Sequence, residues 1–163
     1  MHEKSIELLN GVVADELSAV HQYMYFHFHC DDQGYDLLAA LFKKTSIEEM
    51  LHVEMAAERI LFLGGDVEMQ SSQPVEKITD VREMLVKARK MEEESVHEYN
   101  EWANIASENR DAATRKVFED LVADEERHFD QYDTEISNLD RFGENYLVLQ
   151  SIERSKSVSA RGE

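Results

Sequence analysis

The sequence contains one cysteine and one proline, and only six of its 163 residues are glycine. The single cysteine, Cys30, cannot form a disulfide within the chain, and it excludes the paired thiolates of structural zinc sites and rubredoxin-type iron sites. We therefore expect a protein of the reducing cytoplasm. The scarcity of Pro and Gly also argues against a turn-dense β architecture and favours long helices.

Positive charge is scarce as well, because 17 Lys and Arg face 35 Asp and Glu, which gives a formal net charge of −18. A surface with this charge repels nucleic-acid phosphates and anionic lipids, and it attracts metal cations. The sequence has no apolar run long enough to span a membrane, and its beginning, MHEKSIELLN, is polar and amphipathic. We therefore expect neither a nucleic-acid nor a membrane partner.

Apolar residues recur at helical spacing in four long segments. These segments are predicted as helices over residues 4–31, 35–63, 79–107 and 111–139. Short joints make the first two helices antiparallel, and likewise the last two, whereas the polar stretch 66–77 is long enough to cross the bundle end to end. The sequence thus predicts an all-α, antiparallel four-helix bundle with a long crossover between its second and third helices.

The C-terminal region is predicted to contain a short fifth helix and a tail. Apolar residues between Tyr146 and Ile152 favour the helix, and the Ser-rich, polar residues 154–163 are expected to be disordered. The length of the chain fits one domain, which we place over residues 1–153.

Acidic or histidine side chains interrupt the apolar stripe of each long helix near its middle. The first and third helices each carry one carboxylate there, and the second and fourth each carry a Glu-x-x-His pair, whose members share one helix face. The six residues are Glu16, Glu49, His52, Glu92, Glu125 and His128. One such pair in so acidic a chain would be chance, but two copies at matching heights are harder to dismiss.

The charges of these six residues predict a dinuclear metal site. Four carboxylates buried without partners would destabilise the fold by several kcal/mol each, so a compensating positive charge is needed. Two divalent cations balance four glutamates and two neutral histidines, whereas one cation does not. Oxygen-rich ligands with one imidazole per metal suit iron or manganese better than a structural zinc. We expect iron.

Four segments of the chain resemble bacterioferritin, a member of the ferritin-like di-iron superfamily. They are SIEEMLH at 46–52, ERILFLG at 58–64, DEERH at 124–128 and GENYL at 143–147. The likeness extends from about residue 5 to residue 153. The ligand pattern of that superfamily is also the same: two helices each supply one Glu, and the other two each supply a Glu-x-x-His pair.

The resemblance implies a function in iron storage. The six residues would then be ligands of a ferroxidase centre, with Glu49 and Glu125 bridging two iron ions. The protein would oxidise ferrous iron with dioxygen or hydrogen peroxide and store ferric mineral in a hollow shell of twenty-four subunits. Asp124 and Tyr23 are candidate partners for the second nitrogens of the ligating histidines.

Haem binding is a further implication of the resemblance. Met50 follows Glu49 directly and matches the methionine with which two bacterioferritin subunits ligate haem b at their shared interface. The chain departs from the family at Lys43 and Lys44, where many members carry Tyr and His. Because of this departure, the resemblance does not decide the details of the haem pocket or the presence of an inner-surface iron site.

The six ligands alone also fit other proteins. A soluble di-iron oxidase or peroxidase would use the same set, and a miniature ferritin that protects against oxidative stress would assemble its iron site between subunits. Other candidate ligands do not group in the same way. Because alternate residues of a helix point to different faces, His27, His29 and Cys30 are predicted to serve packing and surface roles.

Overall fold

The structure is a computed structural model that describes residues 2–161. The described residues form five helices and no strand, which confirms the all-α prediction. The helices are α1 (Glu3–Asp32), α2 (Asp36–Phe62), α3 (Val81–Glu108), α4 (Ala112–Phe142) and α5 (Asn145–Ala160). None of the helices described is both long enough and apolar enough to cross a membrane.

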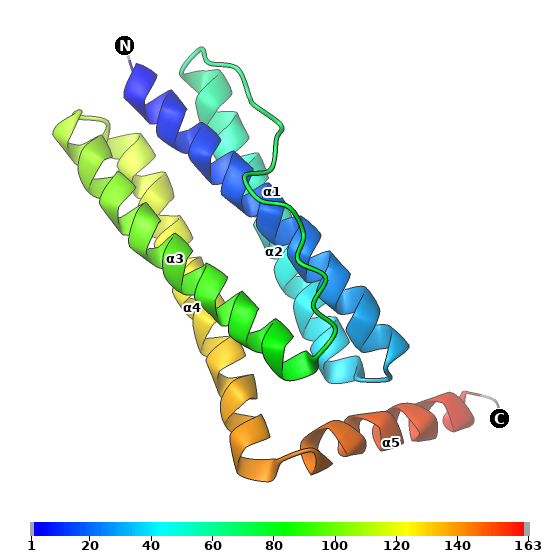
Figure 1. Ribbon diagram of the computed structural model, residues 1–163. Helices are drawn as coiled ribbons and strands as arrows, with labels where there is room; N and C mark the ends of the chain where they lie inside the picture. Colours follow the sequence, from blue (N-terminus) through cyan, green and yellow to red (C-terminus); the bar gives the residue numbers. More distant parts are fainter. Residues whose placement is uncertain (1, 162–163) are drawn as a thin grey trace.

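The four long helices form two antiparallel hairpins, α1 with α2 and α3 with α4 (Figure 1). The two hairpins pack together so that α1 also contacts α3 and α2 also contacts α4. The crossover, residues 63–80, runs along α1 from one end of the bundle to the other (Figure 1). The predicted connectivity of the bundle is therefore confirmed.

Aspartate caps fix where α3 and α4 begin. Asp80 accepts a hydrogen bond from the backbone N–H of Glu83 (2.9 Å), and Asp111 accepts one from the N–H of Thr114 (3.2 Å). Such caps satisfy N–H groups that have no partner within the helix. Asp111 also pairs with Arg59 of α2 at 2.8 Å, so this cap joins the two hairpins at one end of the bundle.

Hydrogen bonds fasten the crossover to the middle of α1. The amide of Gln22 donates to the carbonyl of Glu76 (2.9 Å) and accepts from its N–H (2.8 Å). One turn earlier, Ser18 Oγ accepts from the N–H of Gln73 (2.9 Å). These contacts hold the crossover at a defined height on the bundle.

The apolar core is divided into two clusters by a polar layer. In one cluster Phe42 packs its ring against Phe26 (5.2 Å between centroids) and Tyr132 (5.5 Å). The other cluster surrounds Phe118 and Leu9. Each fully buried side chain of this size contributes about 1.5–3 kcal/mol. The clusters on either side stabilise the bundle and hold the charged layer between them.

Helix α5 is longer than the sequence predicts. It continues to Ala160, whereas we expected disorder over 154–163, so the structure differs from that prediction for residues 154–160. Residues 162 and 163 lie outside the described residues. Arg154 donates to the carbonyl of Asp31 (2.6 Å), which ties this segment to the end of α1. A polar, Ser-rich composition removes apolar anchors, but it does not prevent a helix that has already started from continuing.

Candidate metal centre

The structure brings all six predicted residues together in the polar layer. α1 contributes Glu16, α2 Glu49 and His52, α3 Glu92, and α4 Glu125 and His128. Every one of these side chains is at most 2% exposed. They form two groups whose potential ligand atoms lie within 4.8 Å of one another, and Glu49 and Glu125 belong to both groups. Two shared carboxylates between two ligand sets are what a dinuclear site requires.

The first ligand set is arranged around His52. Its Nδ1 lies 2.8 Å from Glu49 Oε2, 3.0 Å from Glu125 Oε1 and 3.7 Å from Glu16 Oε1. These atoms come from three different helices, so the bundle and not the local sequence sets their separation.

The second set repeats this arrangement around His128. Its Nδ1 lies 3.0 Å from Glu49 Oε1, 3.6 Å from Glu92 Oε2 and 3.7 Å from Glu125 Oε2. The rings of His52 and His128 face each other with their centroids 5.9 Å apart. The two halves of the centre are therefore related by an approximate twofold symmetry.

Several buried atoms of the centre have no hydrogen-bond partner among the described residues. They are both carboxylate oxygens of Glu49, Oε1 of Glu125, and the Nδ1 atoms of His52 and His128. Buried polar atoms are almost always hydrogen-bonded, and these ones approach one another without the directions that hydrogen bonds need. Two cations would satisfy all of them at once, so the donor set fits a pair of metal ions.

Acidic partners orient the two histidines from outside the centre. His52 Nε2 lies 3.0 Å from Asp124 Oδ2, as predicted for Asp124, and His128 Nε2 pairs with Glu48. A proton held on Nε2 by a carboxylate leaves Nδ1 directed inward as a ligand atom. Glu48 was not among the predicted residues, although the sequence contains a signal for it: Glu48 precedes Glu49 just as Asp124 precedes Glu125.

Two buried tyrosines bind the terminal carboxylates. Tyr99 donates a hydrogen bond to Glu16 Oε1 (2.6 Å), and Tyr23 donates one to Glu92. The prediction that Tyr23 would be a partner of a histidine is therefore wrong, because its hydroxyl reaches the carboxylate of α3 instead. Tyr99 was not among the predicted residues, since nothing in the spacing of its neighbours marks its hydroxyl.

Burial changes the proton affinities of the centre. It raises the pKa of Glu16 to about 8, with the Glu49 carboxylate adding to the effect, and it raises the pKa of Glu92 to about 8 with help from Glu125. Burial alone would lower the pKa of His52, but the carboxylates around its Nδ1 outweigh burial and raise it. The same balance raises the pKa of His128. Protons on these groups can therefore offset the buried charge when no cation does.

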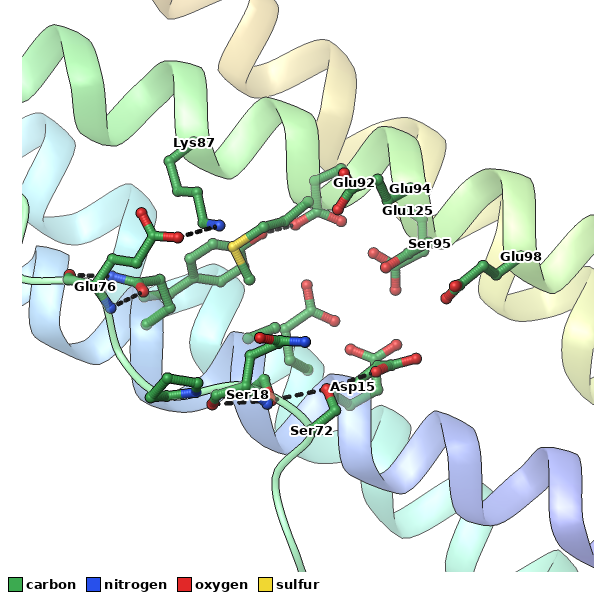
Figure 2. Close-up of a pocket in the computed structure, with 18 residues that line it drawn as sticks. Asp15, Ser18, Ser72, Glu76, Lys87, Glu92, Glu94, Ser95, Glu98 and Glu125 are labelled. Carbon is green, nitrogen blue, oxygen red and sulfur yellow. Dashed lines mark hydrogen bonds and ion pairs between the residues drawn. The ribbon is translucent and has the colours of Figure 1, made fainter.

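An open recess leads from the surface to this centre between α1, α3 and the crossover (Figure 2). Eight of its lining side chains are carboxylates, and its one cationic residue, Lys87, pairs with Glu76 at 2.8 Å. Asp15 on α1 and the exposed Glu98 on α3 line its outer part. Burial raises the pKa of Glu98 and the neighbouring Asp15 raises it further, because the two carboxyl groups lie close together.

The remaining candidate residues lie outside the centre. Met50 is on the outer face of α2, where it is 51% exposed. Cys30 is fully buried and contacts Met84 Sδ at 3.6 Å, and His27 Nδ1 lies 2.7 Å from the carbonyl of Ala39. The predicted packing role of Cys30 is confirmed, and burial raises the pKa of its thiol to about 12.

Comparison with known proteins places this arrangement in a family. The model of the ferritin-like domain matches residues 6–142. Bacterioferritin from Rhodobacter capsulatus is 36% identical over 147 residues, which cover 90% of this chain and 91% of the relative. Bacterioferritin from Desulfovibrio desulfuricans is 35% identical over 145 residues, which cover 89% of this chain and 81% of the relative. The chain belongs to the bacterioferritin family.

Solved structures of bacterioferritins share the fold closely. The Desulfovibrio desulfuricans protein, solved with its diiron site in different catalytic states, superposes with a TM-score of 0.89 at 34% identity, covering 91% of this chain and 86% of that one. The Rhodobacter capsulatus protein, solved with a metal-free dinuclear site and haem iron in a crystallographic special position, gives 0.88 at 33% identity, covering 93% and 94%. The predicted ferritin-like bundle is therefore confirmed.

Proposed function

We propose that this protein stores and detoxifies iron, oxidising ferrous ions at the buried centre and keeping the ferric product inside a hollow shell of twenty-four copies. The observation that carries the proposal is the set of unpartnered oxygen and nitrogen atoms that converge in the polar layer. Membership of the bacterioferritin family supports the same function.

Each of the six residues then has a role. Glu16 with His52, and Glu92 with His128, would each hold one ferrous ion, and Glu49 and Glu125, which belong to both ligand groups, would be shared between the two ions. When bound, the two ions supply the electrons that reduce dioxygen or hydrogen peroxide. The protein fixes the spacing of the ligands through four helices. Asp124 and Glu48 keep both imidazoles in the ligating orientation, so little reorganisation is needed when the ions arrive.

Specific features disfavour the alternative functions. A di-iron oxidase acting on an organic substrate needs an apolar cavity beside the metals, whereas the recess here is lined mainly by carboxylates and other polar groups. A miniature ferritin builds its site between subunits and lacks a terminal fifth helix. Here one chain supplies all six residues, and a fifth helix, α5, follows α4.

The charge of the chain bears on partners and location. A formal net charge of −18 per subunit opposes binding to nucleic acids and to anionic membranes. The single buried cysteine suits a reducing compartment. We therefore propose a cytoplasmic protein whose partners are ferrous iron, its oxidant and further copies of itself.

Iron titration and particle size test the proposed function together. Anaerobic titration should bind two ferrous ions per chain at the centre, and air should then oxidise them. Light scattering should give a particle of about 450 kDa, twenty-four times the 18.9 kDa subunit. A monomeric protein that binds no ferrous iron would contradict the proposal, whereas a small particle with a working centre would favour the oxidase alternative.

We also propose that Met50, contributed by each of two subunits, ligates haem b at their interface. Met50 is rotated about 100° from Glu49 around α2. It is half-exposed beside Ile47 and Leu51, which are 46% and 49% exposed, so its thioether lies in an apolar surface away from the centre. Such a surface suits a macrocycle enclosed between two copies.

Haem content tests this assignment. Protein expressed with a haem precursor should show a low-spin haem spectrum, and Met50→Leu should abolish that spectrum, because leucine keeps the apolar volume but offers no sulfur ligand. Met69→Leu is the matched control, since Met69 is an exposed methionine on the crossover (66%). Haem retained by Met50→Leu, or absent from the wild type, would contradict the assignment.

A further inference from the structure

We propose that Asp15 and Glu98 form a staging site that captures divalent cations at the mouth of the recess before they reach the buried centre. This inference rests on the proposed function, because it assigns a route and a first binding step to the same centre. Both residues lie outside the set of six, and neither was selected from the sequence.

The two carboxylates come from opposite walls of the recess. Asp15 lies on α1 next to Glu16, and Glu98 lies on α3 next to Tyr99, the residue that binds Glu16. Figure 2 shows Glu98 extending from α3 toward the side of the recess that carries Asp15. Ser72 of the crossover donates a hydrogen bond to Asp15 Oδ1 (2.7 Å), which holds that carboxylate at the mouth.

Buried ligand atoms lie along the same recess. Glu49 and Glu125 belong to its lining together with Asp15 and Glu98. Both are at most 1% exposed and have oxygens without a hydrogen-bond partner among residues 2–161. The recess therefore leads from the exposed Glu98 and the half-buried Asp15 to unpartnered carboxylate oxygens in the interior. An incoming cation would meet these two kinds of site in that order.

The charge of the outer recess favours cations only. Asp15 and Glu98 have no Lys or Arg beside them in the lining, because its one cation, Lys87, is held by Glu76. Outside the lining, Lys90 pairs with the exposed Glu94 at 3.6 Å. Negatively charged carboxylates gathered in a concave surface concentrate the electric field and raise the local concentration of cations. Two carboxylates are an incomplete ligand set for a divalent ion, so a cation captured there keeps water ligands and can move on.

A purely structural role for Asp15 predicts something different. Its hydrogen bond with Ser72 could serve only to fasten the crossover, and in that case removal of the serine hydroxyl would have the same effect as removal of the carboxylate. Ser72→Ala breaks this hydrogen bond and leaves the charge of the recess intact. Glu98 has no hydrogen bond to the crossover among residues 2–161, so Glu98→Gln changes charge without touching that anchor.

The experiment follows cobalt(II) uptake by the assembled, metal-free protein in a stopped-flow absorbance instrument. In Asp15→Asn/Glu98→Gln, uptake at sub-saturating Co²⁺ should slow at least about fivefold, while two ions per chain still bind at the end. The matched control is Glu101→Gln/Asp130→Asn, which removes the same charge from exposed positions outside the recess and should behave as wild type. Added salt should slow the wild type more than the double variant.

Ferrous oxidation gives a second readout. The half-saturating Fe²⁺ concentration should rise about fivefold in the double variant with the maximal rate unchanged, and Ser72→Ala and the control pair should show neither effect. Equal uptake rates in the double variant and the control pair, or equal slowing in Ser72→Ala, would overturn the staging site. A wild type that binds fewer than two Co²⁺ per chain would instead overturn the proposed function, and the staging site with it.

Discussion

Replacing Glu92 or His128 with alanine should slow ferrous oxidation at least about tenfold while the helical content stays near that of the wild type. Each substitution removes one ligand from the same half of the centre, where His128 Nδ1 and Glu92 Oε2 lie 3.6 Å apart. Loss of even an outer partner of a metal ligand commonly costs ten- to a hundredfold in affinity or activity, and loss of a ligand should cost no less.

Neighbouring residues supply matched controls for these variants. Glu93→Ala and His97→Ala remove the same side chains from exposed positions on α3 and should leave the rate unchanged. Circular dichroism checks the fold, and stopped-flow oxidation of ferrous iron under air measures the initial rate. Wild-type rates in both Glu92→Ala and His128→Ala would rule out the assigned centre.

The positions of the six residues could be predicted because they contradict their surroundings. A carboxylate within an apolar stripe is visible in one dimension, and helical spacing shows that Glu49 and His52 share a face. Both boundaries of each of the four long helices followed from the same periodicity to within three residues. The sequence therefore predicts each helix and the residues that this helix contributes to the polar layer.

Asp124 was a candidate partner for a histidine, but helical spacing could not predict which helices the contacts of the centre would join. Asp124 of α4 orients His52 of α2, and Glu48 of α2 orients His128 of α4, so each Glu-x-x-His pair depends on the opposite helix. Such a crossed arrangement depends on the axial register of α2 against α4, and this register is fixed by packing over the whole bundle. The hydrogen bond from Tyr99 to Glu16 depends on α1 and α3 in the same way.

The recess could not be predicted from the sequence for a related reason. Its outer wall is the crossover, whose position depends on polar contacts such as those of Gln22 with the backbone of Glu76. Residues of a polar connection carry no periodic signal, so the sequence predicts that the connection is long without predicting where it lies. Asp15 and Glu98 acquire a shared environment only when that path and the α1–α3 packing are both known.

Thermal stability should depend on pH in opposite directions with and without bound metal. In the metal-free protein, the pKa values of Glu16 and Glu92 are raised from 4.5 to about 8, so between these values the folded state binds more protons than the unfolded state. Stability contributed by such groups falls as the pH rises through this window. The raised pKa values of His52 and His128 act in the same direction, since their contribution is complete below 6.5 and is lost as the pH rises.

Bound metal reverses this dependence because it needs deprotonated ligands. Affinity for the metal then rises with pH, and an ion that binds only the folded state stabilises it further as affinity grows. The melting temperature of the metal-free protein should therefore fall from pH 6 to pH 8, while that of the Co²⁺-loaded protein should hold or rise. A difference of one bound proton between the folded and unfolded states changes the free energy of unfolding by about 1.4 kcal/mol per pH unit. This change is enough to shift the melting temperature by several degrees.

Differential scanning calorimetry at a series of pH values measures both slopes. Glu16→Gln/Glu92→Gln provides the control, because amides cannot titrate, and it should flatten the decline of the metal-free protein between pH 6 and pH 8. Calorimetric titration with Co²⁺ in buffers of different ionisation enthalpy should also detect protons released on binding, and fewer in this variant. Parallel slopes for the loaded and metal-free wild type would show that these buried groups do not exchange protons for metal.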